Sequence, residues 1–93
     1  MTEKQWSVEI VIEEHESGED GSKTRAKAGL RTPGGDTLVG VGYARRNPSD
    51  PEVPEIGDEL ATARALADLS HQLIEATVSD LEAATHSRVH LTG

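Results

Sequence analysis

The sequence contains no cysteine and no phenylalanine, and its only aromatic residues are Trp6 and Tyr43. Without cysteine there is no disulfide framework, no thiolate nucleophile and no thiolate metal site. With few aromatics and 34% hydrophobic residues, the core must be aliphatic and thin. No apolar run approaches the roughly 18 residues of a membrane span, and the N-terminus lacks the basic and apolar regions of a signal peptide. These absences predict a cytoplasmic protein without a membrane segment.

The length and the net charge further limit the kinds of protein that this chain can be. Ninety-three residues predict one domain over 1–93 with one modest core and little room for a deep active-site cavity. The formal net charge of −8 disfavours non-specific binding to nucleic acid or to an anionic membrane, because the long-range field repels both.

Three stretches alternate between apolar and polar residues, which predicts strands at about 5–14, 23–31 and 37–46. In the first two, the inner faces are expected to be Trp6, Val8, Ile10 and Ile12, and Thr24, Ala26, Ala28 and Leu30. The third stretch is ambiguous. We favour Val39, Val41 and Tyr43 pointing inward, and the alternative is that Gly40, Gly42 and Ala44 face the core and admit a helix closely.

The region from Pro54 to Thr85 has apolar residues at helical spacing and is rich in Ala and Leu, which predicts a helix over about 54–85. The predicted apolar face comprises Leu60, Ala63, Leu66, Ala67, Leu73, Ile74, Val78 and Leu81. An uninterrupted helix is favoured, although Ser79-x-x-Glu82 resembles a second capping box that would break it near Thr77. Residues 88–92 alternate weakly and could form a short strand or a frayed tail.

The predicted fold is α+β, a three-stranded antiparallel β-meander packed on a long C-terminal α-helix. We expect Leu66, Leu73 and Ile74 to be buried against Val8, Ile10 and Ile12. A helix of this length spans about 45 Å, whereas a nine-residue strand spans about 30 Å. The overhanging end favours a symmetric homodimer, for which the candidate contacts are Val11, Val78 and Leu81.

Charge is segregated along the chain. Residues 1–20 hold seven acids and one lysine, residues 21–46 six bases and one aspartate, and residues 47–93 nine acids and two arginines. The basic block predicts a stripe that contacts phosphates or an acidic partner, with Arg25, Lys27, Arg31, Arg45 and Arg46 as candidate contacts. We favour partial internal neutralisation of this stripe: with Ile10 facing Ala26, Glu13 would stand opposite Lys23 and Glu9 opposite Lys27. Arg45 and Arg46 escape that pairing.

Chemistry-bearing motifs are weak. Gly40-Val41-Gly42 lacks the third glycine and the strand-to-helix turn of a dinucleotide site. His71 and Glu75, with Asp68 nearby, and the pair His86 and His90 have half-site spacing for a metal but lack further ligands. We therefore expect no enzyme, no metal and no cofactor.

The stretch TLVGVGYARRNPSDPEVPEIGDELATARALADLSHQLIEATVSDLEAAT resembles an actinobacterial family of conserved hypothetical proteins, best known in mycobacteria, with residues 38–74 the most specific part. The resemblance implies a fold like that of double-stranded-RNA-binding domains, a loose likeness to ribosome-hibernation factors and a role in stress or dormancy. It implies no catalytic residues. We expect a non-enzymatic homodimeric interaction module that binds a protein partner; the alternative is a ribosome- or RNA-associated factor.

Overall fold

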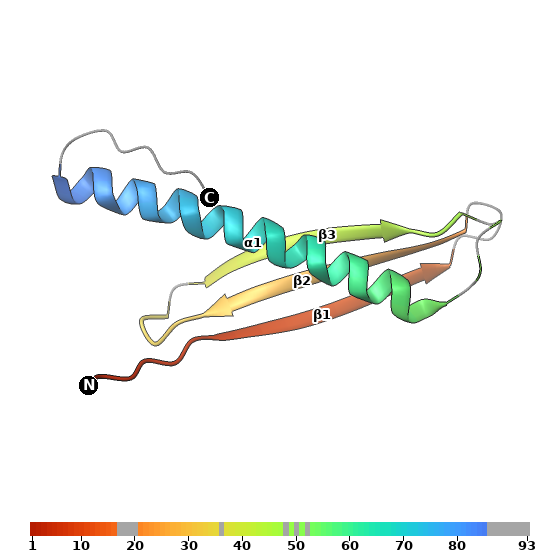
Figure 1. Cartoon of the computed structure of the whole chain (residues 1–93), viewed down its shortest axis with the longest axis horizontal. Helices are drawn as coiled ribbons and strands as arrows, with labels where there is room; N and C mark the ends of the chain where they lie inside the picture. Colours follow the sequence, from red (N-terminus) through yellow and green to blue (C-terminus); the bar gives the residue numbers. More distant parts are fainter. Residues whose placement is uncertain (17–20, 36, 48, 50, 52, 86–93) are drawn as a thin grey trace.

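The computed structural model describes residues 1–16, 21–35, 37–47, 49, 51 and 53–85. Three strands precede one helix: β1 (Ser7–Glu16), β2 (Ser22–Arg31), β3 (Thr37–Arg45) and α1 (Pro54–Thr85). The strands form one antiparallel sheet in the order β1-β2-β3, and α1 lies across one face of it (Figure 1). The predicted α+β class, a β-meander packed on a long C-terminal helix, is confirmed.

The turn between β2 and β3 follows from its sequence. Pro33 and Gly34 occupy the centre of a four-residue turn, which the Gly35 amide closes by donating to the Thr32 carbonyl at 3.0 Å. Gly35 has a φ of 84°, a left-handed conformation that costs glycine little and other residues more. This turn fixes the antiparallel return of β3 beside β2.

The register between β1 and β2 differs from the predicted one by two residues. Ile10 stands opposite Ala28, not Ala26, so Glu13 faces Arg25 and Glu9 faces Gly29. A slip of two keeps every side chain on its face of the sheet, so the alternating pattern cannot distinguish the two registers.

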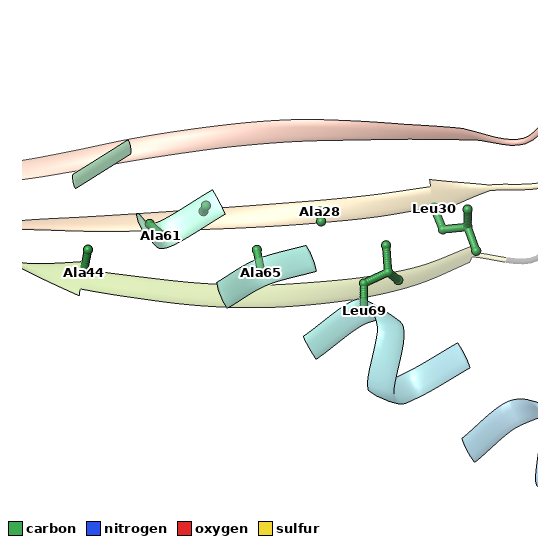
Figure 2. Packing of buried hydrophobic residues seen from close by; sticks show 7 residues of the cluster. Ala28, Leu30, Ala44, Ala61, Ala65 and Leu69 are labelled. Carbon is green, nitrogen blue, oxygen red and sulfur yellow. The ribbon is translucent and has the colours of Figure 1, made fainter. Parts of the chain in front are cut away.

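The core is built mainly from alanine and leucine between β2, β3 and α1. As predicted, the inner face of β2 is buried, with Ala26 and Ala28 fully covered. The complete buried cluster is Ala26, Ala28, Leu30, Ala44, Ala61, Ala65 and Leu69 (Figure 2). No described side chain larger than alanine is completely buried, so the core is thin, as the composition indicates.

Gly40 and Gly42 form a close seam with α1, and the favoured orientation of β3 was wrong. Both glycines are buried, whereas Val39 and Tyr43 are exposed on the other face. A Cβ at Gly42 would overlap the Ala61 carbonyl and the Ala65 amide of the helix backbone. Only a residue without a side chain permits this approach, so the alternative orientation is correct.

The buried stripe of α1 was also misassigned. It consists of Ala61, Ala65 and Leu69, while Leu66 is 43% exposed. Leu60, Ala63 and Ala67 are exposed as well, and Leu73, Ile74 and Val78 are half-buried. The glycine seam draws the helix over β3, so small residues face the sheet and the larger aliphatic side chains flank the contact.

Because α1 lies over β3, it covers β1 poorly. Val8 and Ile12 point to the helix side of the sheet, opposite Leu30 and Ala26, as predicted. They are nevertheless 43% and 40% exposed, and Trp6, expected in the core, precedes β1 and is 55% exposed. Ile10 is half-buried and packs at the margin of the core.

The helix is continuous, as favoured, and its last part projects beyond the strands (Figure 1). Near the suspected break, the Thr77 hydroxyl donates to the Leu73 carbonyl at 2.8 Å, a bond that helices accommodate. The predicted strand or tail at 88–92 lies outside the described residues.

Candidate functional site

The β3 edge of the sheet is closed by three side chains from α1. The guanidinium of Arg64 donates to the Tyr43 carbonyl at 2.7 Å, and the amide of Gln72 donates to the Val39 carbonyl at 2.7 Å. Between them, Asp68 accepts the Val41 amide at 2.9 Å, and Gln72 also donates to Asp68 at 3.2 Å. These edge-capping residues recur every four positions, so they lie in a row along α1.

The β1 edge is open. Because Val39, Val41 and Tyr43 direct polar backbone groups away from β2, their opposite residues on β2 must bond to β1. Val11 and Glu13 are therefore bonded to β2, and the alternate residues Val8, Ile10 and Ile12 turn their backbone groups outward. No described segment pairs with this side of β1.

Exposed apolar side chains lie beside the open edge. Val8 and Ile12 flank the half-buried Ile10 on the helix side of β1. On α1, Leu66 lies on the side of the Ala61–Ala65–Leu69 stripe that is turned away from the edge-capping residues. The open edge thus combines unpaired backbone groups with an apolar margin.

The face of the sheet opposite α1 is basic. Its register rows place Lys23 between His15 and Arg45, Arg25 between Glu13 and Tyr43, and Lys27 between Val11 and Val41. We call Lys23, Arg25, Lys27, Arg31 and Arg45 the basic face. Val11, Val39 and Tyr43 are about half exposed on the same surface.

No base of this face forms an ion pair with an acid whose side chain is described. The contacts of His15 with Glu13 at 3.9 Å and of His71 with Glu75 at 2.9 Å are ion pairs only when the histidine is protonated, and neither involves the basic face. The shifted register leaves Lys27 opposite Val11 instead of Glu9. The Nε of Arg25 is buried without a hydrogen-bond partner. The predicted pairings of Glu13 with Lys23 and of Glu9 with Lys27 are therefore wrong, and Glu13 stands opposite Arg25 instead.

Among the candidate contacts, Arg46 differs from the other four. Its Nε donates to the Ser22 hydroxyl at 3.3 Å, and its Nη1 donates to the Asn47 carbonyl at 3.1 Å. It thus ties the end of β3 to the start of β2, apart from the basic face. The structure brings Arg25, Lys27, Arg31 and Arg45 together on that face.

The candidate dimer contacts lie in two places. Val11 lies on the sheet face opposite the helix, 45% exposed. Val78 and Leu81 lie in the C-terminal part of α1, half-buried and 38% exposed respectively. The sequence analysis did not predict that Arg64, Asp68 and Gln72 cap the β3 edge. Their four-residue spacing, beside that of Ala61, Ala65 and Leu69, could have indicated one row along the helix.

The histidine and carboxylate groups do not assemble a metal centre in the described ranges, where no three candidate ligands come together. Nε2 of His71 is 2.9 Å from Oε1 of Glu75, and both side chains are largely exposed. His86 and His90 lie outside those ranges. None of the described helices is both long and apolar enough to cross a membrane.

A hollow of about 380 Å³ lies where the first turn of α1 meets the ends of β2 and β3. Its walls are mostly apolar, with Val53, Ile56 and Leu60 on one side and Ala44 on the other. Thr24 contributes a largely buried hydroxyl. Glu14, Ser22, Arg45 and Arg46 also line it.

Comparison with known proteins gives a family but no activity. The family model described as Rv2632c-like matches residues 4–90. The uncharacterised protein Mb1767 of Mycobacterium bovis is 51% identical over 86 residues, covering 92% of this chain and 85% of the relative. Rv2632c of Mycobacterium tuberculosis is 50% identical over 86 residues, covering 92% and 86%. The crystal structure of Rv2632c matches with a TM-score of 0.78 at 49% identity, covering 94% of this chain and 96% of that one. On sequence and structure together, this chain belongs to the Rv2632c-like family.

Proposed function

We propose that this protein is a non-enzymatic cytoplasmic interaction module that acts as a homodimer and binds an acidic segment of a protein partner. The observation that supports it is the basic face, where five bases lack ion-pair partners among the described side chains. Glu9 and Glu13 share that surface, so it carries net positive charge on a chain of −8.

The composition of this surface suits a peptide or a protein surface. Lys27 and Arg25 lie between exposed aliphatic and aromatic side chains, namely Val11, Val39 and Tyr43. Protein interfaces combine apolar contact with charged groups that set orientation and rate of association. An acidic amphipathic segment would satisfy both the unpaired bases and the exposed apolar groups.

The overall charge favours a short acidic segment over a long polyanion. A nucleic acid on the basic face also experiences the long-range field of the rest of the chain, including the acids Glu55 and Glu59 at the start of α1 on the other side of the sheet. Long-range repulsion therefore reduces its affinity. The alternative, a ribosome- or RNA-associated factor, would use the same bases, because lysine and arginine also bind phosphate groups.

The test uses two defined probes, a double variant of the basic face and a control variant. A labelled glutamate-rich amphipathic peptide and a single-stranded RNA oligonucleotide are titrated against the wild type by fluorescence anisotropy. The double variant Lys27→Gln with Arg31→Gln removes two charges from the basic face. The single variant Lys4→Gln removes one charge outside the basic face and serves as the control.

We expect salt-sensitive peptide binding that the double variant weakens about tenfold or more and Lys4→Gln leaves within about twofold. Tighter binding of RNA, lost in the same double variant, would replace the protein partner by the RNA alternative. Absence of both interactions would refute the proposed use of this face.

A cellular measurement addresses the proposed stress or dormancy role. Tagged protein is recovered from growing and starved cells of the native organism, and the captured proteins are compared with those of the double variant. A partner supports the proposal only if its capture rises on starvation, requires Lys27 and Arg31, and maps to an acidic segment. Cosedimentation with ribosomes through the same residues would support the alternative.

A further inference from the structure

We infer that two copies of this chain join through their β1 edges, antiparallel, with Ile10 on the two-fold axis. The inference rests on the homodimer of the proposed function and specifies its interface. It commits to a second copy of the chain as the occupant of the open edge. The two three-stranded sheets would then continue into one another, with both helices on the same side.

The first support is the unequal treatment of the two edges. At β3, Arg64, Asp68 and Gln72 occupy the outward backbone groups, so no further strand can pair there without displacing them. At β1, the described residues provide no such cover for Val8, Ile10 and Ile12. An uncapped edge strand is a template for another strand. The β1 strand of a second copy is such a strand, and every copy of the protein supplies one.

The second support is charge, which selects the register. An axis through Glu9 places that residue opposite its own copy, and an axis through Val11 places Glu9 opposite the partner's Glu13. Like charges directly opposite one another destabilise a strand pair. An axis through Ile10 instead places Glu9 opposite the partner's Val11 and Glu13 opposite the partner's Ser7. In this register Glu9, Glu13 and Glu14 each face a residue that is not an acid.

The third support is apolar overlap. With Ile10 on the axis, Ile10 meets the partner's Ile10, and Val8 meets the partner's Ile12 on the helix side. Shifting the axis to Ile12 would instead place Ile10 opposite the partner's Glu14. Because Val8 and Ile12 are 43% and 40% exposed in the single chain, the Ile10 register removes these apolar side chains of both copies from water.

This arrangement also accounts for how an acidic chain can associate. The contact uses backbone groups and aliphatic side chains, so each chain's charge of −8 opposes it only at long range. Dimerisation should therefore strengthen as salt is added. The two basic faces would lie on the same side of the joined sheet, opposite the helices, and the paired β1 strands with Glu9 and Glu13 would separate them.

Cysteine cross-linking tests the register directly, because the chain has no cysteine of its own. Directly opposed residues of a hydrogen-bonded antiparallel pair have Cα atoms about 5.5 Å apart, within disulfide range. Ile10→Cys should oxidise to a covalent dimer. Val8→Cys and Ile12→Cys alone should not, but their equimolar mixture should. Efficient cross-linking of Val8→Cys alone would overturn the register.

Sedimentation equilibrium tests the interface without cross-linking. Val8→Lys places a charge at the open edge and should weaken the dimer about tenfold or more. Val39→Lys makes the same change at a 48% exposed position on the capped strand and should leave dimerisation unchanged. Leu81→Lys examines the projecting end of α1 in the same way. Loss of the dimer in Leu81→Lys alone, or a monomer mass at every concentration and salt level, would refute the β1 interface.

One further variant separates this dimer from the proposed partner-binding surface. Lys27→Gln with Arg31→Gln should still form the dimer, so loss of peptide binding in it reports only on the basic face. A monomer in this variant would overturn the separation of the two surfaces.

Discussion

At the β3 edge, α1 supplies a hydrogen-bonding side chain for each of Val39, Val41 and Tyr43, whereas the described residues supply none for Val8, Ile10 and Ile12 at the β1 edge. The difference arises because one helix crosses the sheet obliquely and leaves it over β3 (Figure 1). A single helix can close one edge of a small sheet, and the other edge is then available for association.

The glycine seam carries the largest expected effect. Gly42→Val would push a side chain into the Ala61 carbonyl and the Ala65 amide, which are backbone groups that cannot move aside. We expect a loss of more than about 4 kcal/mol in the free energy of unfolding, or no cooperative folding. Urea denaturation followed by circular dichroism measures it.

The control for the seam is Gly29→Ala on the opposite face of β2. Its Cβ would meet only the Glu9 carbonyl, at 3.9 Å, which is ordinary contact. A loss below about 1 kcal/mol is expected there. Equal losses in both variants would show that strand glycines, and not the approach of α1, determine the result.

Leu69 lies in the same seam and is 3% exposed. Leu69→Ala should lower the free energy of unfolding by about 2–5 kcal/mol, since it removes buried methyl groups and leaves a cavity. Leu66→Ala, at a position the periodicity wrongly favours for the core, should cost less than about 1 kcal/mol. If Leu66→Ala proved the more harmful, the observed helix face would be contradicted.

Asp68→Ala removes the acceptor for the Val41 amide and should cost about 1–3 kcal/mol. The specific readout is hydrogen exchange, which should accelerate at the Val41 amide more than at amides bonded within the β2–β3 ladder. Uniform acceleration would indicate global destabilisation and not an opened edge. We also expect the uncapped β3 to promote concentration-dependent association beyond that of the wild type.

Glu75→Gln should have the smallest effect. Its carboxylate pairs with His71 at 2.9 Å, but both side chains are mostly exposed, 66% and 71% respectively. Exposed pairs four residues apart on a helix contribute about 0.5 kcal/mol or less. A thermal melt in which Glu75→Gln lost as much as Asp68→Ala would show that the edge contacts are no stronger than ordinary surface pairs.

The sequence predicted those features that follow from strong periodicity. Alternation identified the inner face of β2 from Thr24 to Leu30, and the Ala- and Leu-rich composition identified one long helix. The orientation of β3 was harder, because Gly40 and Gly42 have no side chain whose polarity could mark a face. Only the packing of α1 against them resolves it.

The helix face and the candidate surfaces show the limits of pattern reasoning more clearly. Large aliphatic residues normally mark the buried stripe, but here Ala61 and Ala65 do, since a glycine strand accepts only small partners. The basic stripe was visible in the sequence, whereas its pairing with β1 was not, because a two-residue slip leaves the alternation unchanged.

The alanine-on-glycine seam has a calorimetric consequence. The heat-capacity change of unfolding grows with the apolar area exposed, typically about 12–15 cal/mol/K per residue. A core of alanines and two buried leucines, with Val8, Ile12 and Leu66 already in water, exposes little new apolar area when it melts. The dissociated chain should therefore fall below that range, and its stability should change unusually slowly with temperature.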